Sequence, residues 1–184
     1  MRFVVNFVTC LILLLLLPVL SLQARVEVLN PINDLYKHGQ GTMQVYFWKL
    51  YDAEFYLPSK TLDLTDYPQA LKITYLRDIK KKDLIEATKE QWQHIGLTHD
   101  NQNNWLQLLD EIWPEINKND TLVIRVDNSG ASQFFYQKAG GNTLTLLGDV
   151  ADPEFGKSFL AIWLSSKTSR PDLREQLLGL ADLN

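Results

Sequence analysis

The sequence has a single cysteine among its 184 residues, and this residue, Cys10, lies inside an apolar N-terminal run. Residues 25–184 can therefore form no disulfide, no thiolate metal site and no cysteine nucleophile. A chain of about 160 residues can bury a sufficient core without such cross-links. We expect a domain that is held together by hydrophobic packing.

Positive charge is also scarce. Without residues 1–24 the chain has 17 basic and 22 acidic side chains, a formal net charge of −5. Nucleic acids and anionic membranes are bound by basic faces, so we expect neither partner. His94 and His99 have no further ligands at a useful spacing, and no metal or cofactor site is expected.

The N-terminus is almost uninterruptedly apolar. Arg2 precedes the run Phe3–Leu22, a pattern typical of a secretory signal peptide. We expect residues 1–24 to be the signal peptide, cleaved after Ala24 or after Ser21, and residues 25–184 to be one domain. If it is not cleaved, the run is long enough to be a membrane anchor. Export of a cysteine-free domain favours a bacterial periplasm.

The longest strand-like run is Thr42–Leu57, whose odd positions are the more apolar and should face the core. Sixteen residues are long for one strand, so we expect a bend or a bulge near Tyr51 and Asp52. Lys49 lies on the same face. Either its stem lies on apolar surface with the ammonium in water, or it anchors a ligand carboxylate. Just before this run, Gly39 and Gly41 resemble a tight turn.

The rest of the chain alternates between strand and helix signals. Further strands are expected at Val26–Leu29, Ala70–Leu76, Thr121–Asp127, Ser132–Lys138 and Thr143–Leu147, and helices at 83–95 and 105–112. Strands, helices, strands and helices in this order predict an α+β domain, with helices on one face of an antiparallel sheet.

Two helices with clear start signals close the chain. Asp152-Pro153-Glu154 should begin the first, with the Asp152 carboxylate as its N-cap. Ser169 and Asp172 form a capping-box-like pair for the second, which Gly179 should end. Trp163 lies on the apolar stripe of the first helix. These signals describe an architecture and contain no catalytic arrangement.

Four segments together resemble the bacterial chalcone isomerase-like family of exported proteins. They are Tyr51–Pro58 (YDAEFYLP), Ile73–Ile79 (ITYLRDI), Asp152–Phe155 (DPEF) and Ile162–Leu164 (IWL). The resemblance covers residues 39–179. It implies the chalcone isomerase fold, a large antiparallel sheet with a layer of helices over one face. It does not by itself imply the isomerase reaction.

The sequence departs from the family's catalytic pattern. The chain has no arginine between Arg25 and Arg77, where the family's arginine would stand near residue 39. Tyr51 takes the place of the family's threonine, and Leu84 and Gln91 stand where its tyrosine and asparagine would be. A developing oxyanion needs a cation and donors placed in advance. We therefore carry over no catalytic residues.

Three functions remain open at this point. The first is a non-catalytic protein that binds a fatty acid or another small apolar ligand, with Lys49 and Tyr51 or Tyr75 holding a carboxylate. The second is an enzyme with altered chemistry, in which Tyr51 is the acid and Lys49 the base. The third is an interaction module of the cell envelope, which would need an exposed apolar patch. The aromatic side chains of residues 46–56 either fill the core or line a ligand site.

Overall fold

The computed structural model describes residues 30–181. The predicted signal peptide and the predicted strand Val26–Leu29 lie outside the described residues. Within residues 30–181, no helix combines the length and the apolar character needed to cross a membrane.

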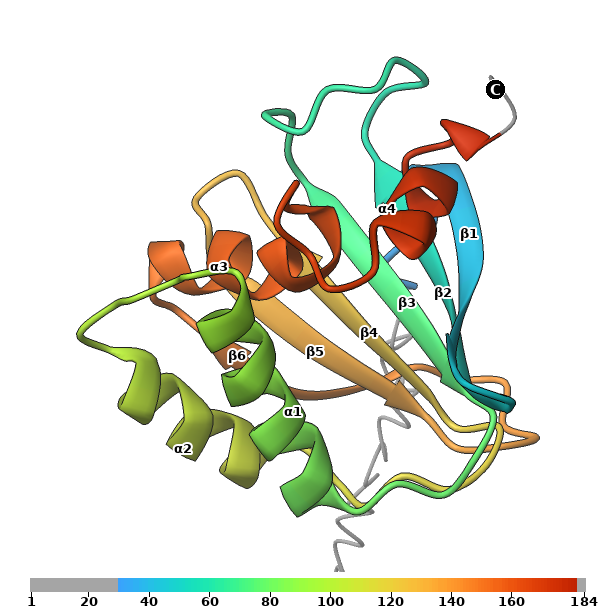
Figure 1. The fold of residues 1–184 in the computed structure, drawn as a ribbon, viewed down its shortest axis with the longest axis vertical. Helices are drawn as coiled ribbons and strands as arrows, with labels where there is room; N and C mark the ends of the chain where they lie inside the picture. Colours follow the sequence, from blue (N-terminus) through green and yellow to red (C-terminus); the bar gives the residue numbers. More distant parts are fainter. Residues whose placement is uncertain (1–29, 182–184) are drawn as a thin grey trace, which may run out of the picture.

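Six antiparallel strands form one open sheet, in which each strand pairs with its neighbours in the chain (Figure 1). The strands are β1 (Tyr36–Val45), β2 (Trp48–Leu57), β3 (Gln69–Tyr75), β4 (Thr121–Val126), β5 (Ser132–Gln137) and β6 (Thr145–Val150). The predicted antiparallel meander is confirmed. Its last strand begins two residues later than expected and continues to Val150.

The run Thr42–Leu57 is not one strand, but the irregularity predicted near Tyr51 is present as a β-bulge: Met43 pairs with Tyr51 and Gln44 with Lys49, so Leu50 is left without a partner. The chain reverses between Val45 and Trp48, which face each other across the β1–β2 hairpin. Tyr46 accommodates the reversal with a φ of 52°, a left-handed conformation that is uncommon outside glycine. The inward register of β2 is nevertheless as expected, because Ala53, Phe55 and Leu57 are buried.

Gly39 and Gly41 do not form a turn, because both lie within β1. A Cβ at Gly39 would overlap the Gln176 carbonyl oxygen, and one at Gly41 would lie 2.7 Å from Leu173 Cδ1. Both contacts come from the last helix, so these glycines let that helix pack directly on the strand.

Four helices complete the domain, and they cover one face of the sheet (Figure 1). They are α1 (Lys81–His94), α2 (Gln102–Ile112), α3 (Pro153–Leu164) and α4 (Pro171–Leu177). The predicted cap of α3 is confirmed, since the Asp152 carboxylate accepts the Glu154 backbone N–H at 3.1 Å. The predicted cap of α4 is wrong: the N-cap position is Arg170, and Ser169 instead donates its hydroxyl to Gln91.

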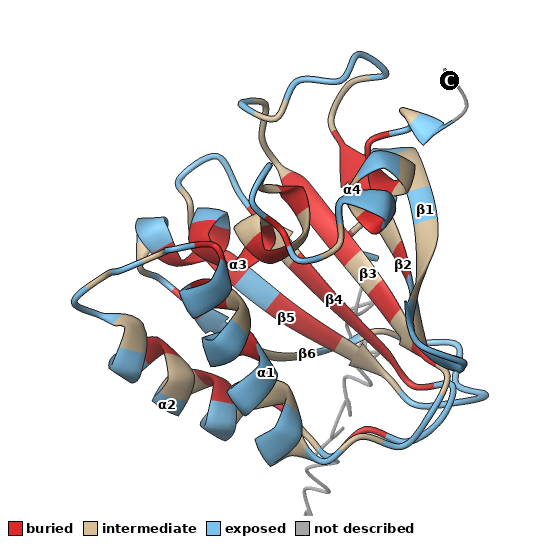
Figure 2. Ribbon diagram, viewed as in Figure 1, coloured by how far each residue is buried: buried red, intermediate tan, exposed pale blue. Residues whose placement is uncertain are grey.

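The buried residues of the core lie between the sheet and the helices (Figure 2). Many of them are aromatic. Trp92, Trp105 and Phe155 pack edge to face, with ring centroids 5.7 to 6.4 Å apart. The Trp92 indole N–H donates to the Ser158 carbonyl oxygen at 2.9 Å, which satisfies its polar atom. A smaller cluster on the other face of the sheet includes Tyr56. The α+β class and the single helical layer are as predicted.

Candidate functional site

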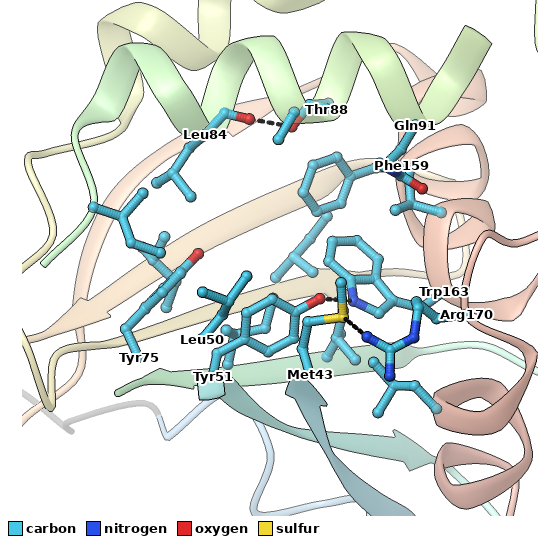
Figure 3. A pocket seen from close by; sticks show the side chains of 18 of the residues that line it. Met43, Leu50, Tyr51, Tyr75, Leu84, Thr88, Gln91, Phe159, Trp163 and Arg170 are labelled. Atoms are coloured by element: carbon cyan, nitrogen blue, oxygen red, sulfur yellow. Dashed lines mark hydrogen bonds between the residues drawn. The ribbon is translucent and has the colours of Figure 1, made fainter. Parts of the chain in front are cut away.

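A cavity of about 380 Å³ lies between the sheet and the helical layer (Figure 3). Most of its lining is apolar and comes from the inward faces of the central strands and from α1 and α3. These apolar residues include Leu71, Ile73, Leu84, Leu122, Ile124, Phe134, Phe159 and Ile162. The volume falls in the range of about 300–1,000 Å³ that is usual for small-molecule sites.

The cavity opens to solvent between α1 and the loop that joins α3 to α4. Asp83 and Ala87 of α1 and Ser169 of the loop line the cavity and are themselves exposed. Met43 and Leu50 of the β1–β2 hairpin also line it, on the other side from α1 (Figure 3). The mouth is therefore framed by three parts of the chain that are far apart in sequence.

Tyr51 supplies a hydroxyl inside the cavity (Figure 3). It accepts the Trp163 indole N–H at 2.9 Å, which leaves the phenol's own proton for another partner. Burial raises the pKa of Tyr51 to about 12, although the Trp163 hydrogen bond and the charge of Arg170 act in the opposite direction. At neutral pH the group is thus a neutral hydrogen-bond donor.

Two further donors in the lining lack a partner within the part of the chain that the structure describes. The Tyr75 hydroxyl makes no hydrogen bond there, and its ring packs edge to face against Tyr51 at 6.0 Å. Burial also raises the pKa of Tyr75. The buried Trp113 Nε1–H is likewise unpaired. The Tyr75 hydroxyl is therefore a donor that a ligand could use, whereas the Trp113 Nε1–H is closed off by the surrounding protein atoms.

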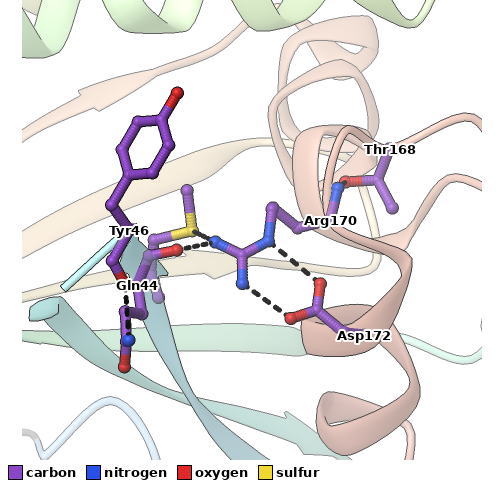
Figure 4. A network of polar contacts seen from close by, with 6 residues as sticks. Gln44, Tyr46, Thr168, Arg170 and Asp172 are labelled. Atoms are coloured by element: carbon purple, nitrogen blue, oxygen red, sulfur yellow. Dashed lines mark hydrogen bonds and ion pairs between the residues drawn. The ribbon is translucent and has the colours of Figure 1, made fainter. Parts of the chain in front are cut away.

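Arg170 contributes a cation at the mouth of the cavity (Figure 4). Its guanidinium holds the Asp172 carboxylate through Nε at 2.9 Å and Nη2 at 2.6 Å. Nη1 donates to the Met43 sulfur at 2.9 Å and to the Gln44 carbonyl oxygen. Since a guanidinium has five N–H donors, one on Nη2 remains for a ligand. Together with Asp172, the arginine ties α4 to β1.

Lys49 lies outside the cavity, and its side chain is exposed. It borders a shallow polar hollow next to the mouth, which Arg170 and Asp172 also line. Of the three residues predicted to hold a carboxylate, the structure therefore brings Tyr51 and Tyr75 together in the cavity and leaves Lys49 apart. Their role in ligand binding stays a prediction.

Arg170 and Trp113 are the polar groups that sequence reasoning missed. The segment around Arg170 reads as the start of a helix, and nothing in its local pattern indicates a contact with the distant Gln44. Trp113 directly follows an apolar helical stripe and reads as core. Only the tertiary fold brings both to the cavity.

The cavity offers little acid–base or metal chemistry. Its lining contains no histidine, and its one carboxylate, Asp83, lies at the exposed mouth. Across residues 30–181, no three His, Cys, Asp or Glu side chains are grouped so that they could hold a metal ion. What the arrangement provides is an apolar interior with a few neutral donors and a cation at its entrance.

An open antiparallel sheet, a single helical layer and an apolar cavity between them define an α+β domain with a small-molecule site. The chain belongs to the chalcone isomerase-like family, whose model matches residues 20–179. The predicted resemblance to this family is confirmed, as is its fold.

A crystal structure of a fatty-acid-binding protein from Arabidopsis thaliana has the same fold. It superimposes with a TM-score of 0.58 at 14% sequence identity, over 80% of this chain and 88% of that one. Identity this low shows the fold alone. A search of curated proteins finds no significant match.

Proposed function

We propose that the protein binds a small amphiphile with one apolar chain, such as a fatty acid, and does not transform it. The observation that carries the proposal is the apolar cavity of about 380 Å³ with the Tyr51 hydroxyl and the Arg170 cation near its mouth. The Arabidopsis protein that shares the fold is a fatty-acid-binding protein, which adds support.

The apolar lining of the cavity favours an occupant. The cavity opens to solvent, so without a ligand its apolar lining can be covered only by water. Water is a poor filler, because most of the lining offers it no hydrogen bond. An apolar chain would restore the missing contacts.

The carboxylate of such a ligand fits best at Arg170 and Tyr51. The guanidinium has an unused N–H, and the Tyr51 proton is free because the hydroxyl accepts from Trp163. The interior has only neutral donors, and a buried carboxylate without a cation is costly. The apolar chain would then extend toward Tyr75 and Trp113. Lys49, which lies outside the cavity, is not needed.

The ionisable groups of the cavity support binding without catalysis. General acid–base catalysis works best with a group whose pKa lies near the working pH. The pKa of Tyr51 is raised to about 12 and that of Tyr75 is raised as well, so neither is a base at neutral pH. No observation favours the altered enzyme with Tyr51 as the acid and Lys49 as the base, since Lys49 does not line the cavity that contains Tyr51.

We also propose that the protein works outside the cytoplasm, in a bacterial periplasm. The support is the apolar run Phe3–Leu22 and the lack of cysteine in residues 25–184. The mass of the protein recovered from cells would show whether residues 1–24 are removed.

Native mass spectrometry of the purified protein tests the binding proposal, followed by titration with saturated fatty acids of increasing length. We expect a co-purifying or added acid at one per chain, with affinity that rises until the chain fills the cavity. Ala87→Trp should block the mouth and abolish binding, because Ala87 lines the mouth and is exposed. Leu62→Trp, in the loop between β2 and β3, is the matched control. Absence of binding for every acid would refute the proposal.

A further inference from the structure

The tip of the β1–β2 hairpin exposes a group of aromatic side chains. This hairpin tip consists of Val45, Tyr46, Phe47 and Trp48, and the last three are 86%, 95% and 60% exposed. The sequence-based expectation that they could fill the core is wrong. Isolated exposed apolar residues are common, but adjacent aromatic rings on one projecting turn indicate a binding surface.

The hairpin tip has a defined shape. The Gln44 side-chain amide donates to the Tyr46 carbonyl oxygen at 2.6 Å and so closes the turn. The Tyr46 ring points away from the Arg170 guanidinium (Figure 4). The guanidinium of Arg77 lies over the Trp48 ring, 4.3 Å from its centroid. These contacts fix the backbone of the tip and one ring while leaving Phe47 in solvent.

Basic side chains lie on the loops at the same end of the sheet as the hairpin tip. The loops that meet there are residues 76–80, 113–120 and 138–144, which lie close to one another (Figure 1). A basic collar is formed by these loops and the adjoining residues of β2 and α1: Lys49, Arg77, Lys80, Lys82, Lys118 and Lys138. All six are exposed, and none forms an ion pair within residues 30–181.

The acidic residues of the same loops are occupied by backbone groups. Asp78 accepts the Lys118 N–H at 2.7 Å, and Glu115 accepts the Lys81 N–H at 2.9 Å. Asp120 is buried and accepts the Ala139 N–H at 2.8 Å. These bonds leave the carboxylates charged, so with the exposed Asp83 of α1 this end of the domain has six basic and four acidic side chains, a local excess of positive charge although the whole chain has a net charge of −4. Net charge did not reveal it, because the loops come together only in the fold.

We propose that the hairpin tip inserts into the surface of an anionic lipid bilayer while the basic collar contacts the headgroups. Tryptophan and tyrosine favour the membrane–water interface, and basic side chains around an inserted apolar group are attracted to anionic lipids. A second copy of the chain fits the surface less well, because two tips that met would bring two basic collars together.

The location of the hairpin tip relates docking to the cavity. Met43 and Leu50 line the cavity and lie only a few residues from the tip on either strand. Docking would thus hold the mouth close to the bilayer. Docking does not require a bound ligand, because only the hairpin tip and the basic collar contact the bilayer.

The test is sedimentation of the protein with vesicles of phosphatidylcholine alone or mixed with phosphatidylglycerol. The full chain is expressed, and its mass is measured first, so that all variants compared have the same N-terminus. We expect binding to the mixed vesicles that weakens as salt is raised. Phe47→Ser should weaken it by about tenfold or more. Leu62→Ser, at an exposed residue in the loop at the opposite end of the sheet, should leave it unchanged.

Fluorescence locates the contact. Mixed vesicles should shift the emission to the blue, and Trp48→Phe should remove most of that shift. Fatty-acid binding in solution should survive Phe47→Ser, which separates failure of docking from failure of the proposed function. Equal binding to both vesicle types, equal effects of Phe47→Ser and Leu62→Ser, or no binding at all would overturn the proposal. So would a dimer that Phe47→Ser dissociates.

Discussion

Arg170 and Lys49 form a matched pair for testing where a ligand carboxylate binds. Both border the same polar hollow, but only Arg170 also lines the cavity. Arg170→Gln and Lys49→Gln each remove one positive charge. A hydrogen bond to a charged group contributes about 1.5–3 kcal/mol, which corresponds to roughly 10- to 150-fold in affinity. Because Asp172 already pairs with the guanidinium, we expect the lower end, about tenfold, for Arg170→Gln and almost no change for Lys49→Gln.

The assay is calorimetric titration with a fatty acid and with its methyl ester. Arg170→Gln should weaken binding of the fatty acid and leave the affinity for the ester nearly unchanged, because the ester has no charge for the guanidinium to bind. Arg170→Gln leaves the Asp172 carboxylate unpaired, and this carboxylate could repel the ligand carboxylate. The double variant Arg170→Gln/Asp172→Asn removes that repulsion, so the loss of affinity that remains is due to the lost attraction of Arg170. Equal losses for acid and ester would mean that Arg170 only supports the shape of the cavity. A larger loss for Lys49→Gln would place the carboxylate in the hollow instead.

Three further variants test the fold. Trp105→Ala should destabilise the protein by about 3–5 kcal/mol in urea unfolding, because a fully buried ring leaves a void. Gly39→Ala should cost about 1–3 kcal/mol in the same assay, since its Cβ would overlap the Gln176 carbonyl oxygen and push α4 from β1. Burial opposes ionisation of Asp120, but hydrogen bonds from Tyr136 and the backbone outweigh it and lower the Asp120 pKa below its usual 3.8. Its stabilisation is therefore present above pH 3.8 and lost as pH falls through the folded pKa, so Asp120→Asn should lower stability at neutral pH and reduce the acid-dependent loss in melting curves.

The parts of the fold that sequence predicted well are those that local signals specify. The start of α3 follows from Asp152 and Pro153, whose roles need only the next few residues. The β4–β5 hairpin likewise follows from two apolar runs around Asn128-Ser129-Gly130. The β1–β2 hairpin was not predicted, because the alternation of apolar residues continues through its turn. No glycine, proline or asparagine marks that turn, and Tyr46 adopts the left-handed conformation instead.

The site could be predicted only in part for a related reason. Tyr51 and Tyr75 lie on strands whose inward face is readable from a period of two, so their place in the lining was foreseeable. Whether a lysine two positions away also points inward depends on an unbroken alternation along the strand. The bulge at Leu50 breaks that alternation, so Lys49 pairs with Gln44 and is exposed. Arg170 reaches the cavity from α4, more than a hundred residues away, and only the packing of α4 on β1 determines this.

Both local misreadings lie at the mouth of the cavity. At the start of α4, Ser169 gives its hydroxyl to Gln91 at 2.7 Å rather than capping the helix, which forgoes about 1 kcal/mol. At the hairpin, aromatic rings that could be buried stay in solvent. Departures from local rules tend to occur where function imposes its own geometry. Ser169 and Gln91 join the loop before α4 to α1 across the mouth, so their hydrogen bond holds the two sides of the entrance at a fixed separation. In the binding mode that we propose, the charged end of the ligand lies beside Arg170 at this entrance and its apolar chain lies inside the cavity.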